Sequence, residues 1–218
     1  MRFLIFAFLL LSACARPLTP NEDQFAAALF GDSLDREAVT IRAGIGVLPL
    51  PRPKPAPGTP REARKVPEDF CKRVPHPSTG PRWPAAFVLW DDVFFSYKFY
   101  RADTFAGWPD SVPLPQFLIM SHELVHVWQW QNRARTGYRP SRSAAEAGVG
   151  IDPYYWQDEA AQEFLSFGFE QQAAMVEDYI CYRLFDPENP RRQELHQIIN
   201  PVLPLDGLEL LLAQHRQS

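Results

Sequence analysis

Apolar and polar residues are arranged along this chain in patterns that predict both helices and short strands. Thr19 and Pro20 form a typical helix start, because threonine can cap the first turn and proline suits the first helical position. Apolar residues follow at helical spacing up to Phe30, and Gly31 ends the pattern. The run Val39–Ile41 then predicts a short strand.

Three later segments carry stronger patterns. The apolar run Ala86–Trp90 predicts a buried strand. Leu118–Arg133 contains no proline or glycine and is rich in apolar residues, which predicts a largely buried helix. After Gly168, apolar residues three and four positions apart predict a second long helix over Phe169–Phe185. We therefore expect an α+β protein with a mostly helical core and a few short strands.

Proline is concentrated between the first strand and the later segments. The chain has 22 prolines in 218 residues, and between positions 49 and 60 nearly every second residue is one. Each proline removes a backbone donor and disfavours helix at the preceding residue, so an extended segment is expected. We interpret it as a solvated loop or, alternatively, as a docking site for a partner or the cell wall. The chain then divides into a signal peptide, an N-terminal helix–strand segment of the domain, a proline-rich linker or insert, and the core, over residues 1–13, 14–48, 49–84 and 85–218.

Composition limits the classes of protein that fit. Hydrophobic residues make up 46% of the chain and aromatic residues 13%, which is enough to build a buried core. With 22 basic against 26 acidic residues, the formal charge is -4. Because no excess of lysine and arginine can neutralise phosphates, nucleic-acid binding is not expected.

The first residues have the pattern of an export signal. Arg2 precedes an unbroken apolar run over residues 3–11, which is too short to span a bilayer that needs about 20 residues. Leu-Ser-Ala-Cys follows, ends at Cys14 and resembles the lipobox of bacterial lipoproteins, whose cysteine receives diacylglycerol. The resemblance implies an outer-membrane lipoprotein facing the periplasm, since Ala15 rather than aspartate follows the cysteine. The alternative is an ordinary signal peptide or a buried N-terminal segment.

The clearest chemistry lies in the string His-Glu-Leu-Val-His at positions 122–126. Residues four apart on a helix are offset by about 40° and about 6 Å, so His122 and His126 project from the same face. Two imidazoles at this spacing suit one tetrahedral zinc ion. Glu123 lies close enough to accept a proton from water at that ion, as a general base does. The alternative is a core helix whose histidines make ordinary hydrogen bonds.

A zinc site of this kind needs a third protein ligand, and the downstream carboxylates Glu159, Glu163, Glu170 and Glu177 are the candidates. Glu170 lies in the first turn of the helix predicted from position 169, where a side chain readily reaches a neighbouring helix. Glu177 lies seven residues further, about 10 Å along the axis, so the two cannot bind one ion together. Glu177 is therefore the alternative third ligand, and at least one of the two carboxylates is expected on a solvated acidic stripe.

Together with Glu-Gln-Gln-Ala at positions 170–173, the His-Glu-x-x-His string resembles the gluzincin branch of zinc metallopeptidases, whose second motif is often Glu-x-x-Ala-Asp. The resemblance implies a zincin-like fold, zinc ligation by His122, His126 and Glu170, and a general-base role for Glu123. Ala174 stands where many gluzincins have an aspartate that orients a histidine, so another partner is implied. More closely, the chain resembles the bacterial Vgr-related proteins, through motifs at positions 18–20, 30–32, 39–42, 122–129 and 170–173.

A hydrolytic site also needs a group that stabilises the developing oxyanion. Tyr154, Tyr155 and His196 are the candidates, since each can donate a hydrogen bond. The sequence thus predicts a zinc-dependent metallopeptidase, anchored as a lipoprotein, with a peptide or protein substrate. The alternatives are a non-catalytic zinc-stabilised lipoprotein that binds an envelope or secretion-system partner, and a metal-free adaptor that acts through its proline segment.

Two cysteines besides Cys14 are present. Cys71 and Cys181 can form a disulfide in an oxidising compartment. The sequence does not show whether they lie within bonding distance, so a disulfide and two thiols both stay open at this point.

Overall fold

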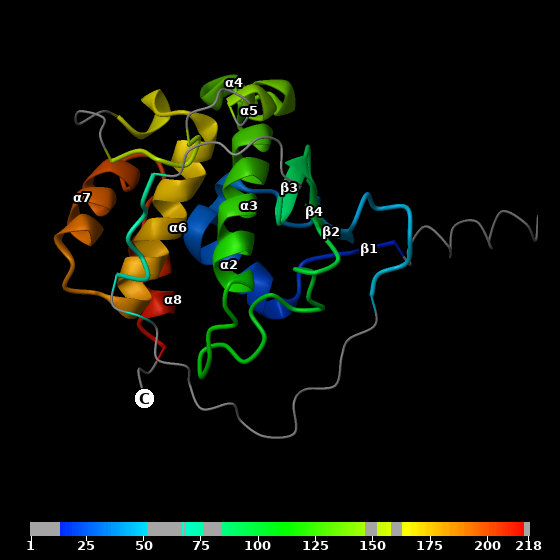
Figure 1. Ribbon diagram of the computed structural model, residues 1–218, viewed down its shortest axis with the longest axis horizontal. Helices are drawn as coiled ribbons and strands as arrows, with labels where there is room; N and C mark the ends of the chain where they lie inside the picture. The colour runs from blue at the N-terminus through cyan, green and yellow to red at the C-terminus, as the bar shows by residue number, and fades with distance from the viewer. Residues whose placement is uncertain are drawn as a thin grey trace, which may run out of the picture.

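The computed structural model describes residues 14–51, 67, 69–75, 84–146, 152–157 and 163–215. Within these ranges, seven α-helices accompany a four-stranded mixed sheet, which confirms the predicted α+β class and its helical majority (Figure 1). The predicted signal peptide, most of the proline-rich segment and the candidate ligand Glu159 lie outside the described residues.

The sheet is formed by four short strands in the order β1-β2-β4-β3. β2 runs parallel to β4, whereas β1 and β3 pair antiparallel with β2 and β4. The strands predicted near positions 39–41 and 86–90 are confirmed, with their bounds shifted by one or two residues. The strand bounds are Ala15–Arg16 for β1, Thr40–Ala43 for β2, Ala86–Leu89 for β3 and Asp92–Phe95 for β4.

The first described helix, α2 (Pro20–Phe30), begins and ends as the sequence predicts. The Thr19 side chain accepts a hydrogen bond from the backbone of Glu22, and the Glu22 carboxylate accepts one from the Thr19 backbone. Glu22 is fully buried and also pairs with Arg16 of β1 at 2.6 Å. This buried ion pair ties the N-terminal strand to the body of the protein.

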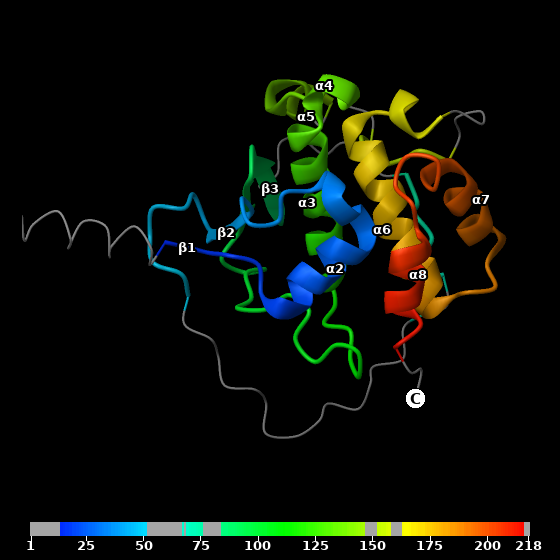
Figure 2. The ribbon, with the colours of Figure 1, turned by 180° about the vertical axis from the view of Figure 1, so that it is seen from behind.

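Two long helices, α3 (Gln116–Gln131) and α6 (Phe169–Phe185), pack against each other at the centre of the molecule (Figure 1). The bounds predicted for α6 are confirmed, while α3 begins and ends two residues earlier than predicted. The short helices α4 (Arg133–Thr136) and α5 (Pro140–Glu146) lie beyond the end of α3. Figure 2 shows α2 beside α8 (Asp206–Leu212), and α7 (Pro190–Ile199) packs on α6. Two 3-10 turns, Gly31–Ser33 and Phe164–Ser166, complete the described elements.

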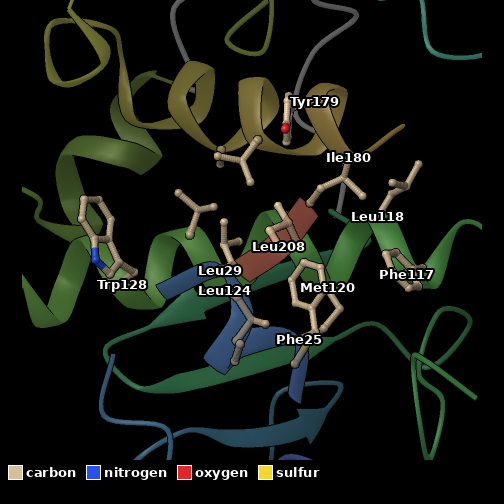
Figure 3. Close-up of a cluster of buried hydrophobic side chains, with 14 of the residues drawn as sticks. Phe25, Leu29, Phe117, Leu118, Met120, Leu124, Trp128, Tyr179, Ile180 and Leu208 are labelled. Atoms are coloured by element: carbon tan, nitrogen blue, oxygen red, sulfur yellow. The ribbon is translucent and has the colours of Figure 1, made fainter. Parts of the chain in front are cut away.

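The hydrophobic core surrounds α3. The central part of this helix is apolar on nearly all sides, so it contacts β3 and β4 as well as α6. Figure 3 shows part of this buried cluster, to which α2, α3, α6 and α8 contribute Phe25, Leu29, Phe117, Leu118, Met120, Leu124, Trp128, Tyr179, Ile180 and Leu208. Packing of this kind holds α3 and α6 rigidly enough to position side chains between them.

Candidate metal centre

The predicted histidine pair lies on the face of α3 that meets α6. The Nε2 atoms of His122 and His126 are 3.2 Å apart, and the two rings are inclined at 74°. This proximity follows from the helical repeat, because residues four apart lie one above the other on the same face. Both side chains are buried.

Glu170 brings a third ligand atom to the same point. It lies in the first turn of α6, and its Oε2 atom is 3.3 Å from His122 Nε2 and 3.2 Å from His126 Nε2. Among the described residues, these three side chains form the group that could hold a metal ion. Of the described carboxylates considered as third ligand, Glu170 is therefore the one that meets both Nε2 atoms.

The distances within this group fit a tetrahedral cation. Ligand atoms that are each about 2.0–2.1 Å from a zinc ion lie about 3.3–3.4 Å from one another at the corners of a tetrahedron. The three observed separations are 3.2, 3.2 and 3.3 Å. The three ligand atoms thus form a nearly equilateral triangle. A single proton can bridge only one pair of these atoms, whereas one cation near the centre of the triangle contacts all three. The donor set of two imidazoles and one carboxylate also suits zinc.

Gln129 orients His126 from the far side of the imidazole ring. Its Oε1 atom lies 2.8 Å from His126 Nδ1. The amide nitrogen of Gln129 donates to the Phe169 carbonyl and to Gln172 Oε1, so its oxygen must be the atom that faces the histidine. This network favours the tautomer with the ring proton on Nδ1, in which Nε2 is available to a metal ion.

Glu177 faces the other ring nitrogen of His122. Its Oε2 atom is 3.3 Å from Nδ1, at ion-pair distance but without the alignment of a hydrogen bond, and the carboxylate also accepts from Arg73 at 3.2 Å. Glu177 thus supplies the carboxylate partner for a histidine that Ala174 cannot supply. It faces Nδ1 of His122, whereas Glu170 faces Nε2 of the same ring. The expectation that one of the two carboxylates lies on a solvated acidic stripe is wrong, because both are paired and mostly buried.

The short helix α5 holds the carboxylate of Glu170 and the start of α6. Ser143 donates to Glu170 Oε1 at 2.6 Å, which leaves Oε2 directed at the histidines. Glu146 accepts from the backbone N–H groups of Phe169 and Glu170 at 2.8 and 3.3 Å, so it caps α6 from outside the helix. Ser143 and Glu146 were not among the predicted residues, since no local motif marks them.

Glu123 is buried beside the histidine pair and is incompletely hydrogen-bonded. Its Oε2 atom has no hydrogen-bond partner among the residues that the structure describes. Burial, opposed by His122 and His126, raises the pKa of Glu123 to about 7. A buried carboxylate with one unsatisfied oxygen and a pKa close to neutrality is suited to accept and return a proton.

His122, His126 and Glu170 interact strongly through their charges. Although burial alone would raise the pKa of Glu170, the two histidines hold it well below its usual range. Burial has the opposite effect on His122, but the contacts with Glu170 and Glu177 raise its pKa to about 10. The pKa of His126 is likewise raised by Glu170 against the effect of burial. The carboxylates therefore favour positive charge at this point of the structure, and positive charge is what a divalent cation would supply.

Two tyrosines flank the histidines. The ring of Tyr154, a predicted oxyanion candidate, lies 5.7 Å from that of His122, and the ring of Tyr138 lies 5.9 Å from that of His126. Burial raises the pKa of both hydroxyl groups, which keeps them protonated and able to donate. Tyr138 was not among the sequence candidates, because it follows α3 in a segment without a recognisable pattern.

The other predicted residues lie in different surroundings. Tyr155 contributes its backbone carbonyl, which accepts from the side chain of Gln171. His196 lies on α7 with its ring 6.1 Å from that of Tyr179, whose hydroxyl bonds Glu209 of α8. Glu163 is exposed at the edge of the 3-10 turn that precedes α6.

A disulfide joins Cys71 to Cys181 and holds a segment 110 residues away against α6. Next to it, Arg73 binds both oxygens of Asp178 at 2.7–3.2 Å, and Trp156 donates to the same carboxylate at 2.9 Å. The disulfide resolves the alternative that the sequence left open and indicates an extracytoplasmic location, because such bonds persist in oxidising compartments.

A hollow of about 1010 Å³ lies along α4 and α5, beside the metal centre. Its lining includes Trp130, Arg133, Tyr138, Arg139 and Arg142. Because Tyr138 also borders His126, the hollow and the centre share one side chain.

Comparison of the chain with known protein families, curated proteins and solved structures gives no match. In the part of the chain that the structure describes, no helix has both the length and the apolar character needed to cross a membrane. The geometry of the site is therefore the basis for the functional argument.

Proposed function

We propose that this protein is a zinc-dependent peptidase of the gluzincin type, held at the outer membrane by an acylated Cys14. The observation that carries the proposal is the convergence of His122, His126 and Glu170 at tetrahedral spacing, with the partly unsatisfied carboxylate of Glu123 beside them. A purely structural zinc site fills four positions with protein ligands, whereas three protein ligands leave one position open.

The residues of the centre divide the chemical work. Bound zinc supplies Lewis acidity, which acidifies a water molecule and polarises a carbonyl group. Glu123 takes a proton from the attacking water as the water oxygen forms a bond to the peptide carbonyl carbon. Glu123 then passes this proton to the leaving nitrogen as the carbon–nitrogen bond breaks. Tyr154 and Tyr138, whose rings flank the two histidines, are the proposed donors to the negative charge that develops on the carbonyl oxygen.

Gln129 and Glu177 position the ligands rather than react. Each lies at the Nδ1 atom of one histidine, so that the Nε2 atoms face the ion. Partners of this kind fix the ring orientation and make the imidazole a stronger ligand. Arg73 neutralises Glu177 on its other side and thereby keeps the carboxylate ionised, since the pKa of Glu177 is lowered by His122 and Arg73 against the effect of burial.

The proposed location combines the lipobox with the disulfide. Cys14 is the cysteine that follows an apolar signal-like run, and the Cys71–Cys181 bond suits the periplasm. With two or more acyl chains, attachment to the bilayer is stable without any membrane-spanning helix.

The test is to exchange Glu123 for glutamine. Glu123→Gln should retain zinc at one ion per chain, yet lose cleavage of an unfolded peptide library by about 10²–10⁴-fold, because only the general base is removed. Glu163→Gln makes the same chemical change on an exposed carboxylate and should leave cleavage intact. If Glu123→Gln with zinc bound still cleaves at the wild-type rate, the proposed mechanism is wrong.

One observation favours a second candidate function, a non-catalytic zinc-stabilised lipoprotein that binds an envelope partner. The three ligands and Glu123 are each less than 9% exposed, so the centre is nearly closed to solvent. This candidate predicts one bound zinc per chain, loss of stability on chelation, and no cleavage by wild-type protein of any peptide in the library.

A further inference from the structure

The end of the sheet next to Cys14 carries an unusual concentration of exposed apolar side chains. Nine large apolar residues are exposed among those described, and four of them lie in two short loops, as Ile45, Val47, Leu48 and Tyr97. The first three are 63%, 65% and 56% exposed, and Tyr97 is 47% exposed. Side chains of this size rarely gather at the surface of a protein without contacting something apolar.

The strand register places these loops together. β2 and β4 are parallel with Ala43 opposite Phe95, so the segments that follow them leave the sheet at the same end. The close approach of Tyr97 to Gly44 confirms their contact, since a Cβ atom on Gly44 would lie 2.5 Å from the Tyr97 ring. Gly44 has a φ of +60°, which turns the chain sharply out of β2 and into the apolar loop.

Cys14 lies at this same end. β1 runs antiparallel to β2 with Ala15 opposite Arg42. Continuing this register places Cys14 beside Ala43, where the apolar loop begins. In Figures 1 and 2, β1 and the segment after β2 lie at one edge of the molecule, away from α7 at the other.

Almost no free chain separates Cys14 from the folded body. β1 begins at Ala15, and the guanidinium of Arg16 is held by the fully buried Glu22 at 2.6 Å. An acyl group on Cys14 therefore cannot act as a long tether. It brings this end of the sheet to the bilayer surface.

The charges at this end suit an anionic bilayer surface. The sequence stretches 44–50 and 96–101 contain no acidic residue, whereas Lys98 and Arg101 are exposed. Arg101 lies next to β1, because its carbonyl accepts a hydrogen bond from Arg16. Cations close to a membrane surface are attracted by anionic lipid headgroups.

We infer that Ile45, Val47, Leu48 and Tyr97 form a membrane-docking face that inserts into the lipid interface beside the acylated Cys14. The inference rests on the acylation proposed above and adds an orientation to it. Figures 1 and 2 show α3 between the sheet and α6, and the metal centre lies on the face of α3 that meets α6, so docking through the loops that follow β2 and β4 turns the metal centre away from the lipid. Substrates would then reach the centre from the aqueous phase.

The experiment uses the full chain, produced with acylation in a Gram-negative bacterium and reconstituted into vesicles of phosphatidylethanolamine and phosphatidylglycerol. Val47→Cys provides a thiol for an environment-sensitive fluorophore, because Cys14 is blocked by its acyl group and the other cysteines form a disulfide. The matched control is Leu210→Cys, which replaces an apolar side chain that is 74% exposed on α8.

Quenchers attached to the lipid chains should quench the fluorophore at position 47 several-fold more than at position 210, since interfacial apolar groups lie about 5–10 Å deep. Equal quenching at the two positions, with acyl-Cys14 verified by mass spectrometry, overturns the docking face and leaves the anchor standing. Absence of an acyl group on Cys14 overturns the anchor and the docking face together. Zinc content and peptide cleavage test the metal centre independently of both.

Discussion

The Cys71–Cys181 disulfide allows a quantitative prediction of stability. It joins residues 110 positions apart, and it links the short segment around Cys71 to the middle of α6. The proposed perturbation is the double exchange Cys71→Ala and Cys181→Ala, which removes the bond without placing hydroxyl groups at two buried positions.

The expected loss follows from the entropy of the unfolded chain. A cross-link that closes a loop of n residues lowers this entropy by about 2.1 + 1.5R ln n cal/mol/K, which for a separation of 110 corresponds to about 4.8 kcal/mol at 25 °C. Domains of this size have a total free energy of unfolding of about 5–15 kcal/mol. The double variant should therefore lose a third or more of its stability.

Urea unfolding followed by tryptophan fluorescence and circular dichroism measures this loss. With an m-value of about 2 kcal/mol/M, the midpoint should fall by about 2.4 M. A chelator is present throughout, so that zinc binding does not contribute. Reduced wild-type protein is the control and should behave like the double variant. If verified reduction lowers the free energy of unfolding by less than about 1 kcal/mol, the loop-entropy argument is refuted for this bond.

Three further predictions concern the metal centre and the N-terminal ion pair. Glu177→Gln should weaken zinc binding about 10–100-fold in competition with a chromophoric chelator, while the exposed Glu194→Gln should not, and equal affinities would remove Glu177 from the site. Glu22→Gln should destabilise the protein by about 3–5 kcal/mol at pH 7, because it leaves Arg16 buried without a counter-charge. The pKa of Glu22 is lowered by Arg16 against the effect of burial. The stability that the Glu22 carboxylate provides is therefore present above pH 4.5 and should disappear as the pH falls through its folded-state pKa. The loss of unfolding free energy caused by Glu22→Gln should accordingly differ between unfolding curves at pH 7 and pH 3. Free zinc at 100 times its Kd should raise the free energy of unfolding by about 2.7 kcal/mol, and an unchanged midpoint would show that the native protein does not bind it.

Local sequence signals were sufficient for the elements that carry the site. The bounds of α6 were predicted because Gly168 precedes the helix and Asp186-Pro187 follows it, and the capped start of α2 was predicted for the same kind of reason. The proximity of His122 and His126 required only the helical repeat, which acts over four residues. These features depend on interactions within one or two turns of chain.

Glu170 was chosen as the third ligand from the gluzincin-like motif and its place in the first turn of α6, because the helical repeat alone could not link it to the histidines. Glu170 is 48 residues from His122 and 44 from His126, and it meets them because of how α3 and α6 pack. The partners of Glu170 on α5 were missed for the same reason, since neither Ser143 nor Glu146 belongs to a pattern readable in the sequence.

The longest-range features were the least predictable. The disulfide and the contacts of Arg73 with Glu177 and Asp178 join positions more than 100 residues apart. The parallel pairing of β2 with β4, which gathers the apolar loops beside Cys14, likewise joins positions about 50 residues apart. Periodicity and capping reflect the backbone preferences of neighbouring residues and can be read along the chain. The convergence of distant side chains depends on which buried surfaces fit together, and that complementarity exists only once the core has packed.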